Sequence, residues 1–313
     1  MEHYVTLFDS LFLPQGLALH TSMERHAGEY TLWVLCMDEA SFDFLKTVEL
    51  PNIRLLRLAE LETDALRAVK LERSIAEYCW TLTPCSIRFV FEAASDAERV
   101  TYLDADIWFR KPPAVLFREL DDSGKAVLIT DHGYAPEHDQ SALSGQYCVQ
   151  FVTFTRAGEA VRTRWEEQCL EWCYARAEDG KYGDQKYLDE WPDRYPGLVH
   201  VLSNRELTLA PWNASRYPYG HAVFWHFHSL RIMRVRSNAV RFQLAAYPLP
   251  SMVRKFVYIP YLEDMKRAIS FAQRKGHCVR PQQKLGLLEW LRHFVIAMWL
   301  QLWWVQTRPA KNM

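Results

Sequence analysis

Residues 99–109 read RVTYLDADIWF, an apolar run that ends in two aspartates separated by a single residue. The β-branched and aromatic residues of Arg99–Leu103 predict a buried strand. Side chains two positions apart on extended chain point to the same side, so Asp104 and Asp106 can both face one divalent cation. Ligands of open α/β sheets gather beyond the carboxyl ends of the strands, and carboxylate oxygens suit Mg²⁺ or Mn²⁺ that bridges phosphate oxygens. The stretch predicts a metal site, with two solvated acids at a turn as the alternative.

The sequence on both sides of this stretch alternates between runs of strand length and runs of helix-forming residues. Strands are expected at 4–8, 31–36, 53–58, 126–130 and 149–154, in addition to 99–103. Helices are expected at 16–25, 60–78, 86–94 and 158–177. Strands that alternate with helices predict an α/β fold whose sheet is covered on both faces.

The composition is that of a globular chain without a strong charge. Of the 313 residues, 49% are hydrophobic and 24% are charged, and the formal charge is −1. This balance argues against nucleic acid as the main partner. The seven cysteines are odd in number and include no CxxC pair, so a disulfide framework is not expected. The start of the sequence lacks a basic segment before its apolar run, and we therefore expect a cytoplasmic protein.

The C-terminal part has a different pattern. Pro248 and Pro250 interrupt the chain, so we expect a catalytic domain at 1–250 and a helical extension at 251–313. Residues 284–305 predict an amphipathic, tryptophan-rich helix whose charges argue against a bilayer span. Two interpretations stay open, a core or dimer helix and a helix that docks on the membrane surface.

Two further motifs contain polar side chains that could contact a substrate or a metal ion. Asp184 and Gln185 follow a glycine and are typical of a polar helix start, or of a carboxylate and an amide presented to a substrate. His226 and His228 are two residues apart in an aromatic run, so both face the same way on a strand. They are either structural histidines or a source of the third protein ligand for a metal held by the aspartates. Two carboxylates and an imidazole would favour Mn²⁺-like ions over Ca²⁺.

Together, and in this order, the motifs resemble those of GT-A glycosyltransferases, and most of all the retaining glycosyltransferase family 8 group that includes lipopolysaccharide-type enzymes. The resemblance spans roughly residues 3–235. It implies a Rossmann-like, mainly parallel mixed sheet flanked by helices. It also implies metal ligation by Asp104, Asp106 and His226, with His228 as the alternative ligand. By the same resemblance Asp184 and Gln185 lie near the reacting carbon of the sugar.

The resemblance also assigns residues to a nucleotide-sugar donor. The residues concerned are Thr6, Phe8, Asp9, Arg88, Asp104 and Arg231. Arg88 precedes Tyr102 by fourteen positions, as in the family. Arg231 stands where the family usually has Lys-Pro-Trp, and Ser229 replaces the family's glycine. These departures affect the phosphate contact and the identity of the sugar.

The expected function is metal-dependent transfer of a sugar from a nucleotide-sugar, by default a UDP-sugar, with Mn²⁺ or Mg²⁺. The acceptor is a glycan or a lipid-linked glycan, and the configuration is retained. In the interpretation in which residues 284–305 dock on a membrane, they bring the enzyme to the inner face of the cytoplasmic membrane. Asp131 and His132 are candidates for the acceptor side, and Trp212 for contact with a sugar ring, each with a structural role as the alternative. Two rival functions are a catalytically inactive scaffold and a nucleotidyltransferase that makes nucleotide-sugars. The second would need a Gly-rich basic loop after the first strand, where residues 9–12 read DSLF.

Overall fold

The structure is a computed structural model that describes residues 1–236, 239–282 and 304–307. Its internal contacts divide the chain into two compact units. The first unit comprises Met1–Asp9, Ala27–Asp104 and Pro112–Arg205. The second comprises Ser10–His26, Ala105–Lys111 and Glu206–Met313. The domain boundary expected near residue 250 stays a prediction.

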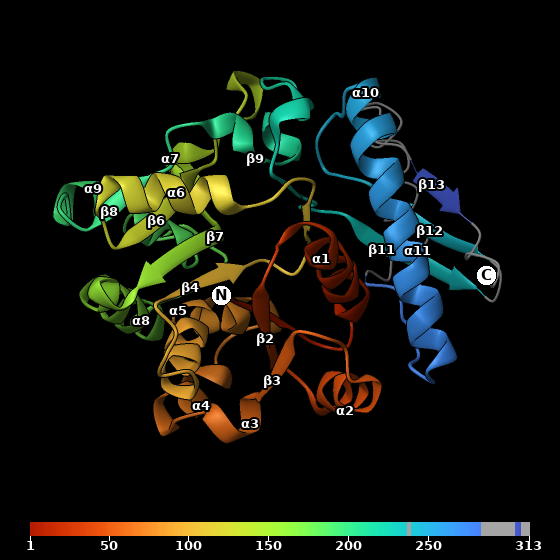
Figure 1. Cartoon of the computed structure of the whole chain (residues 1–313), viewed down its shortest axis with the longest axis horizontal. Helices are drawn as coiled ribbons and strands as arrows, with labels where there is room; N and C mark the ends of the chain where they lie inside the picture. Colours follow the sequence, from red (N-terminus) through yellow and green to blue (C-terminus); the bar gives the residue numbers. More distant parts are fainter. Residues whose placement is uncertain (237–238, 283–303, 308–313) are drawn as a thin grey trace. The chain divides into compact units, whose positions relative to one another are not determined.

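The first unit is built on a mixed, mainly parallel sheet (Figure 1). Its strands, in chain order, are β1 (Glu2–Phe8), β2 (Tyr30–Cys36), β3 (Ile53–Arg57), β4 (Arg99–Leu103), β6 (Val127–Asp131), β7 (Tyr147–Thr155) and β8 (Val199–Val201). They lie side by side in the order β3-β2-β1-β4-β7-β6-β8. Only β7, among the strands described for this sheet, runs antiparallel to its neighbours. The α/β class with a mainly parallel sheet is therefore confirmed.

Helices cover both faces of this sheet. On one face, apolar side chains such as Val5, Val100 and Phe154 join the core beneath α5 (Ile75–Ala93) and α8 (Glu159–Glu171). On the other face, the ring of Phe117 from α6 (Ala114–Ser123) lies 6.0 Å from the rings of both Tyr4 and Phe151. The alternation of Tyr4 and Val5 along β1 shows how one strand serves two layers. The unit also contains α2 (Glu39–Val48), α3 (Leu58–Leu61), α4 (Asp64–Lys70), α7 (Ser141–Ser144) and α9 (Trp191–Arg194).

Two expected helices have different ends from those predicted. The region 60–78 is divided among three helices, because Thr63 caps α4 and Ser74 forms a capping box with Glu77 at the start of α5. Helix α8 ends at Glu171, six residues earlier than expected. The guanidinium of Arg73 donates to the carbonyls of Cys169 and Leu170, each at 2.7 Å, and so satisfies the last turn of α8.

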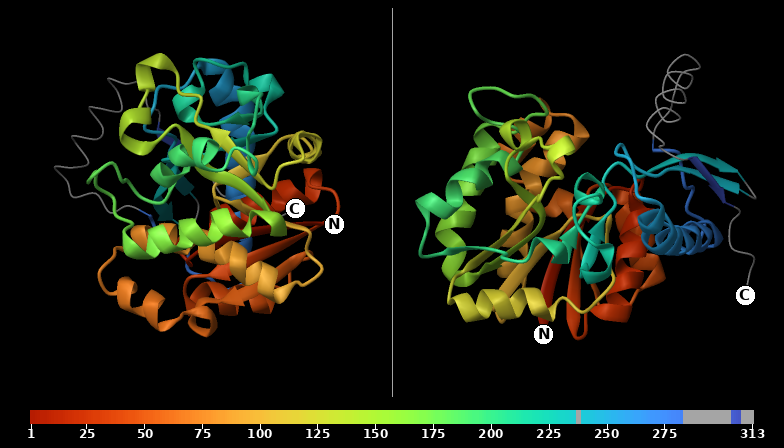
Figure 2. Two further views of the ribbon diagram at one scale, coloured as in Figure 1. Left: turned by 90° about the vertical axis from the view of Figure 1, so that its left-hand side faces the viewer. Right: turned by 90° about the horizontal axis from the view of Figure 1, so that it is seen from above.

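In the residues that the structure describes, the second unit contains two small sheets and two longer helices. One sheet has the order β5-β10-β9, formed by β5 (Ile107–Phe109), β10 (Phe224–His226) and β9 (Thr208–Leu209). The other consists of β11 (Arg231–Arg236), β12 (Ala239–Gln243) and β13 (Trp304–Thr307). Helix α1 (Leu13–His26) packs against β5 and against α11 (Ile259–Arg274), as Figure 2 shows for the two helices. A short α10 (Ser251–Val253) and a π-helical turn at Arg254–Tyr258 lead directly into α11.

The helix expected at 284–305 lies outside the described residues from 284 to 303. Its last two residues belong instead to β13, where Trp304 pairs with Gln243 and Val305 with Phe242. For these two residues the helical prediction is wrong, because the backbone of β12 offers them an antiparallel partner. Within the part of the chain that the structure describes, none of the helices combines the length and the apolar character needed to cross a bilayer.

Candidate active site

The carboxylate of Asp104 is held at the carboxyl end of β4. Its backbone N–H donates to the carbonyl of Gln150 in β7, at 3.2 Å. The hydroxyl of Tyr102 donates to Asp104 Oδ1, at 2.9 Å. The strand end and the tyrosine of the same strand therefore orient this carboxylate, as expected for a residue just beyond a buried strand.

Asp106 and His226 come together through the antiparallel pairing of β5 with β10. The register places Ile107 opposite His226, and Phe227 N–H donates to the carbonyl of Asp106 at 2.9 Å. Asp106 Oδ1 lies 3.1 Å from His226 Nε2. The contact thus follows from the register of two short strands, although Asp106 and His226 are 120 positions apart in the sequence.

Asp104, Asp106 and His226 each offer a ligand atom, and these atoms lie within 4.8 Å of one another. Asp104 is the last residue of the first unit, and a single residue separates it from Asp106. Two carboxylate oxygens and an imidazole nitrogen form a donor set that fits Mn²⁺ or Mg²⁺. His228 is exposed, whereas His226 is buried.

Asp106 is ionised at neutral pH. Burial opposes its charge, but the neighbouring His226, Arg231 and His228 outweigh this effect and lower the pKa of the Asp106 carboxyl to about 2. A carboxylate must be deprotonated to bind a metal ion. The Asp106 carboxylate is therefore in the protonation state that a metal ligand needs.

The pKa of Asp184 is shifted in the opposite direction to that of Asp106. It lies at the start of the 3₁₀ turn Gln185–Glu190 and is only 2% exposed. Burial raises the pKa of its carboxyl to about 8, the charge of Asp104 also raises it, and a hydrogen bond with Thr83 opposes the shift. Among the described residues its Oδ2 has no hydrogen-bond partner. The carboxyl group is therefore largely protonated at neutral pH.

The side chain of Gln185 is oriented by the short helix α7. Its amide nitrogen donates to the carbonyl of Ser144, at 2.8 Å. The neighbouring Lys186 donates to the carbonyl of Ser141, at 3.0 Å. These two bonds fix the segment that carries Gln185 against the helix that precedes β7.

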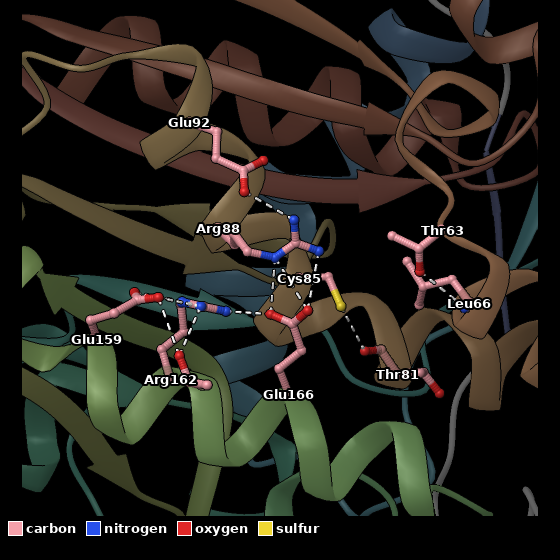
Figure 3. Close-up of polar contacts among 10 residues, drawn as sticks. Thr63, Leu66, Thr81, Cys85, Arg88, Glu92, Glu159, Arg162 and Glu166 are labelled. Atoms are coloured by element: carbon pink, nitrogen blue, oxygen red, sulfur yellow. Dashed lines mark hydrogen bonds and ion pairs between the residues drawn. The ribbon is translucent and has the colours of Figure 1, made fainter.

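The side chain of Arg88, a residue of α5, points toward α8 in the first unit (Figure 3). Its guanidinium contacts Glu166 of α8, with Nε at 3.2 Å and Nη2 at 3.1 Å, and Glu92 of its own helix at 3.0 Å. Arg162 pairs with Glu166 from the same helix. The role of Arg88 at the donor stays a prediction, since the hydrogen bonds described for its guanidinium are to carboxylates.

The remaining donor residues lie at two places. In the first unit, Thr6 and Phe8 are buried at the carboxyl end of β1, directly before Asp9. In the second unit, Arg231 lies over the ring of Phe12 at 5.5 Å and helps to lower the pKa of Asp106. The positive charge of Arg231 is therefore close to Asp106, a candidate metal ligand of the same unit.

The candidates for the acceptor side have structural contacts. Asp131 accepts hydrogen bonds from Gly133 N–H (2.6 Å) and from the Gln146 amide (3.0 Å), and it pairs with Arg205 at 2.8 Å. The ring of His132 stacks on Tyr134, with centroids 4.6 Å apart. These contacts order the loop after β6.

Trp212 is 4% exposed, and its ring lies edge-on to that of His226 at 5.4 Å. Its contacts favour support of the histidine over the stacking of a sugar, which requires an open face.

The sequence analysis does not assign the roles of two residues in the site, Tyr102 and Thr83. The bond from Tyr102 to Asp104 and the influence of Thr83 on Asp184 both depend on contacts that the motifs do not encode. For Tyr102 the alternation of side chains along β4 offers a signal, since it points to the same side as Asp104.

Comparison with known proteins identifies the fold but not the family. No protein-family model matches the chain. Two uncharacterized proteins of Bacillus subtilis (strain 168) are each 27% identical to it: YfnD over 289 residues (87% of this chain, 91% of YfnD) and YfnF over 290 residues (86% and 93%).

Three solved structures are similar to it at low sequence identity. Apo mouse xyloside xylosyltransferase 1 has a TM-score of 0.51 and 15% identity, with 72% of this chain and 97% of that chain covered. The galactosyltransferase LgtC in complex with donor and acceptor sugar analogs has a TM-score of 0.51 and 15% identity, with 87% of this chain and 99% of that chain covered. The apo glycosyltransferase GlyE of Streptococcus pneumoniae TIGR4 has a TM-score of 0.52 and 12% identity, with 91% of this chain and 66% of that chain covered. At these identities the likeness concerns the fold, so the chain has the GT-A fold of glycosyltransferases.

Proposed function

We propose that this chain is a metal-dependent glycosyltransferase. It transfers a sugar from a nucleotide-sugar, by default a UDP-sugar, to a glycan or lipid-linked glycan, with retention of configuration. The observation that carries the proposal is the contact of Asp106 with His226, two residues after Asp104, the carboxylate at the end of β4. In a fold that glycosyltransferases use, this donor set suits a divalent cation and hence a diphosphate.

The protein's own residues would handle the leaving diphosphate. Asp104, Asp106 and His226 would hold Mn²⁺ or Mg²⁺, which when bound acts as a Lewis acid toward the charge that develops on the diphosphate. Arg231 would add a charge-assisted hydrogen bond to a phosphate oxygen, since its charge already acts on Asp106.

The residues near the sugar would stabilise rather than attack it. A protonated Asp184 is a poor nucleophile, so its carboxyl would hold a sugar hydroxyl by hydrogen bonds. Gln185 is a neutral amide whose nitrogen already donates to Ser144, and its carbonyl oxygen would face the positive charge on the sugar. The departing diphosphate would then take the proton of the acceptor hydroxyl. Attack from the face of the leaving group would retain the configuration.

The two rival functions are less well supported. An inactive scaffold has no need of two aspartates and a histidine that can hold a metal ion. A nucleotidyltransferase would need a basic, glycine-rich loop after β1, and that place holds residues 9–12, DSLF.

Donor hydrolysis tests the proposal. The purified chain is incubated with Mn²⁺ and a panel of nucleotide-sugars without an acceptor, and nucleotide release is followed by HPLC. We expect release from one donor, reduced roughly 100-fold or more in Asp106→Ala. Asp64→Ala is the matched control, because its side chain is fully exposed in the first unit and should leave the rate unchanged.

If no nucleotide-sugar of the panel releases nucleotide, the binding of UDP in the presence of Mn²⁺ is measured by calorimetry. Binding that Asp106→Ala abolishes would support an enzyme that requires its acceptor before it releases nucleotide. The absence of binding for UDP and for the other nucleoside diphosphates would contradict the proposal.

A further inference from the structure

We infer that Asp264 of α11 is a positioning residue for the metal centre: it binds Trp108 and Arg25 and thereby fixes β5, which starts one residue after Asp106. This inference rests on the proposed function. All of these residues belong to the second unit.

Asp264 is a buried carboxylate whose two oxygens both have partners. It is 3% exposed. Its Oδ2 accepts a hydrogen bond from the indole N–H of Trp108, at 2.8 Å. The guanidinium of Arg25 in α1 forms a two-pronged ion pair with it, with Nη1 3.2 Å from Oδ1. One side chain of α11 thus joins α1 and β5.

The path from Asp264 to the metal ligands is short. Trp108 is the central residue of β5 and pairs with Trp225 of β10, the residue before His226. Because β5 starts directly after Asp106, a shift of Trp108 along or across the strand pair would move Asp106 relative to His226. The positions of these two ligands therefore depend on where α11 holds the indole ring.

A second contact between α11 and the same strand pair acts beside the first. Phe227, the residue after His226, stacks on Tyr261 with ring centroids 3.6 Å apart. The ring of Trp108 lies edge-on to Tyr261 at 6.1 Å. Asp264 follows Tyr261 by three positions and so lies on the same face of the helix. Helix α11 thus contacts the residue that follows each ligand by one or two positions.

The chemistry of Asp264 favours positioning over stability alone. A buried ion pair contributes little net stability, because desolvation of the charges offsets their attraction. An apolar residue at this place would pack against Trp108 but would let the indole slide. A carboxylate with directional bonds to an N–H group and to a guanidinium fixes the position of both partners. Residues that orient metal ligands typically change metal affinity by 10–100-fold when they are replaced.

Mn²⁺ titration of the full-length chain by calorimetry tests the inference. We compare the wild type with Asp264→Asn, which removes the charge, and with Trp108→Phe, which keeps a ring but removes the N–H donor. Each variant should bind Mn²⁺ about 10–100-fold more weakly while it keeps the far-UV circular dichroism of the wild type. The double variant should lose less affinity than the product of the two single fold-losses, because both changes weaken the contact between Asp264 and Trp108.

Glu263→Gln is the matched control. It removes the neighbouring carboxylate of α11, whose described partner is Lys266 of the same helix, and it should leave Mn²⁺ affinity within about twofold of the wild type.

Wild-type affinity in folded Asp264→Asn and Trp108→Phe would overturn the inference and leave the proposed function intact. If Asp264→Asn does not fold, Trp108→Phe alone decides between these two results. If the wild type itself binds no Mn²⁺, the proposed metal site is wrong, and the inference is wrong with it.

Discussion

Asp184 illustrates how the environment of one residue decides its chemistry. In the unfolded chain its carboxyl group titrates near pH 4. In the folded protein, burial and the charge of Asp104 raise its pKa to about 8. Between these values the native state binds a proton that the unfolded state has lost. The contribution of Asp184 to stability therefore falls as the pH rises from about 4 to about 8.

Replacement by asparagine should remove this dependence. We expect Asp184→Asn to be more stable than the wild type at pH 7.5, with an advantage that grows by up to ~1.4 kcal/mol per pH unit between roughly pH 4 and 8. Urea unfolding in metal-free buffer at pH 5, 6, 7 and 8 measures the effect. Asp64→Asn, at a fully exposed position, serves as the control. A constant difference across this range would contradict a raised pKa.

The residues with a local signature could be predicted, and those with distant partners could not. The spacing of Asp104 and Asp106 and their place after an apolar run are visible in the sequence, and both residues belong to the trio with His226. The bond between Trp108 and Asp264 joins residues 156 positions apart. A tryptophan in a strand and an aspartate in a helix carry no sign of each other until the chain is folded.

At the level of elements, α5 and α8 are joined by a network of charges (Figure 3). Glu166 of α8 lies at its centre, between Arg88 of α5 and Arg162 of its own helix. The side chain of Arg162 is 3% exposed and that of Glu166 is 15% exposed. Removal of the carboxylate would leave the charge of Arg162 buried with Glu159 as its other described carboxylate partner.

Glu166→Gln should therefore destabilise the protein by about 2–4 kcal/mol, since it removes the buried carboxylate that Arg88 and Arg162 share. Glu92 contacts Arg88 from the solvent side, with a side chain that is 58% exposed, so Glu92→Gln should cost less than about 1 kcal/mol. Urea unfolding at neutral pH compares the two. Equal losses would show that burial of the network does not matter.

The ends of elements divide in the same way between local and distant causes. Strands such as Arg99–Leu103 follow from runs of β-branched and aromatic residues, and the structure agrees with the expected bounds. The break at Ser74 has a local cause, a capping box with Glu77, and could have been found in the sequence. The end of α8 has a distant cause, because Arg73 reaches its last carbonyls from 96 positions away.

At the level of the whole molecule, the order of strands and helices along the chain predicts a mainly parallel sheet. It does not predict how the chain divides into two compact units. Alternating strands and helices imply the mainly parallel sheet of the first unit. The second unit collects Ser10–His26 and Ala105–Lys111 with the C-terminal part. Both segments are short excursions between strands of the first unit, and nothing in their composition separates them from their neighbours.

The tryptophans near the C-terminus suggest a contact with a membrane surface. Trp290 and Trp299 lie in the stretch 284–303, outside the described residues, between Lys284 and Arg308. Aromatic residues flanked by cationic ones suit the headgroup region of an anionic membrane, where a lipid-linked acceptor would reside. We propose that this stretch brings the enzyme to such a surface.

Flotation with vesicles tests this proposal on the full-length chain. We expect the wild type to float with vesicles that contain an anionic phospholipid, and much less with purely zwitterionic ones. Trp290→Ser/Trp299→Ser should reduce flotation at least about tenfold, since each tryptophan contributes apolar area at the interface. This variant keeps Trp304–Thr307, the strand that pairs with β12. Leu71→Ser/Ile75→Ser is the control, because these exposed apolar side chains lie in the first unit. Unchanged flotation of the tryptophan variant would refute membrane docking by this stretch. A difference in mass between the tryptophan variant and the wild type, measured by light scattering, would instead favour a stretch that joins two copies of the chain.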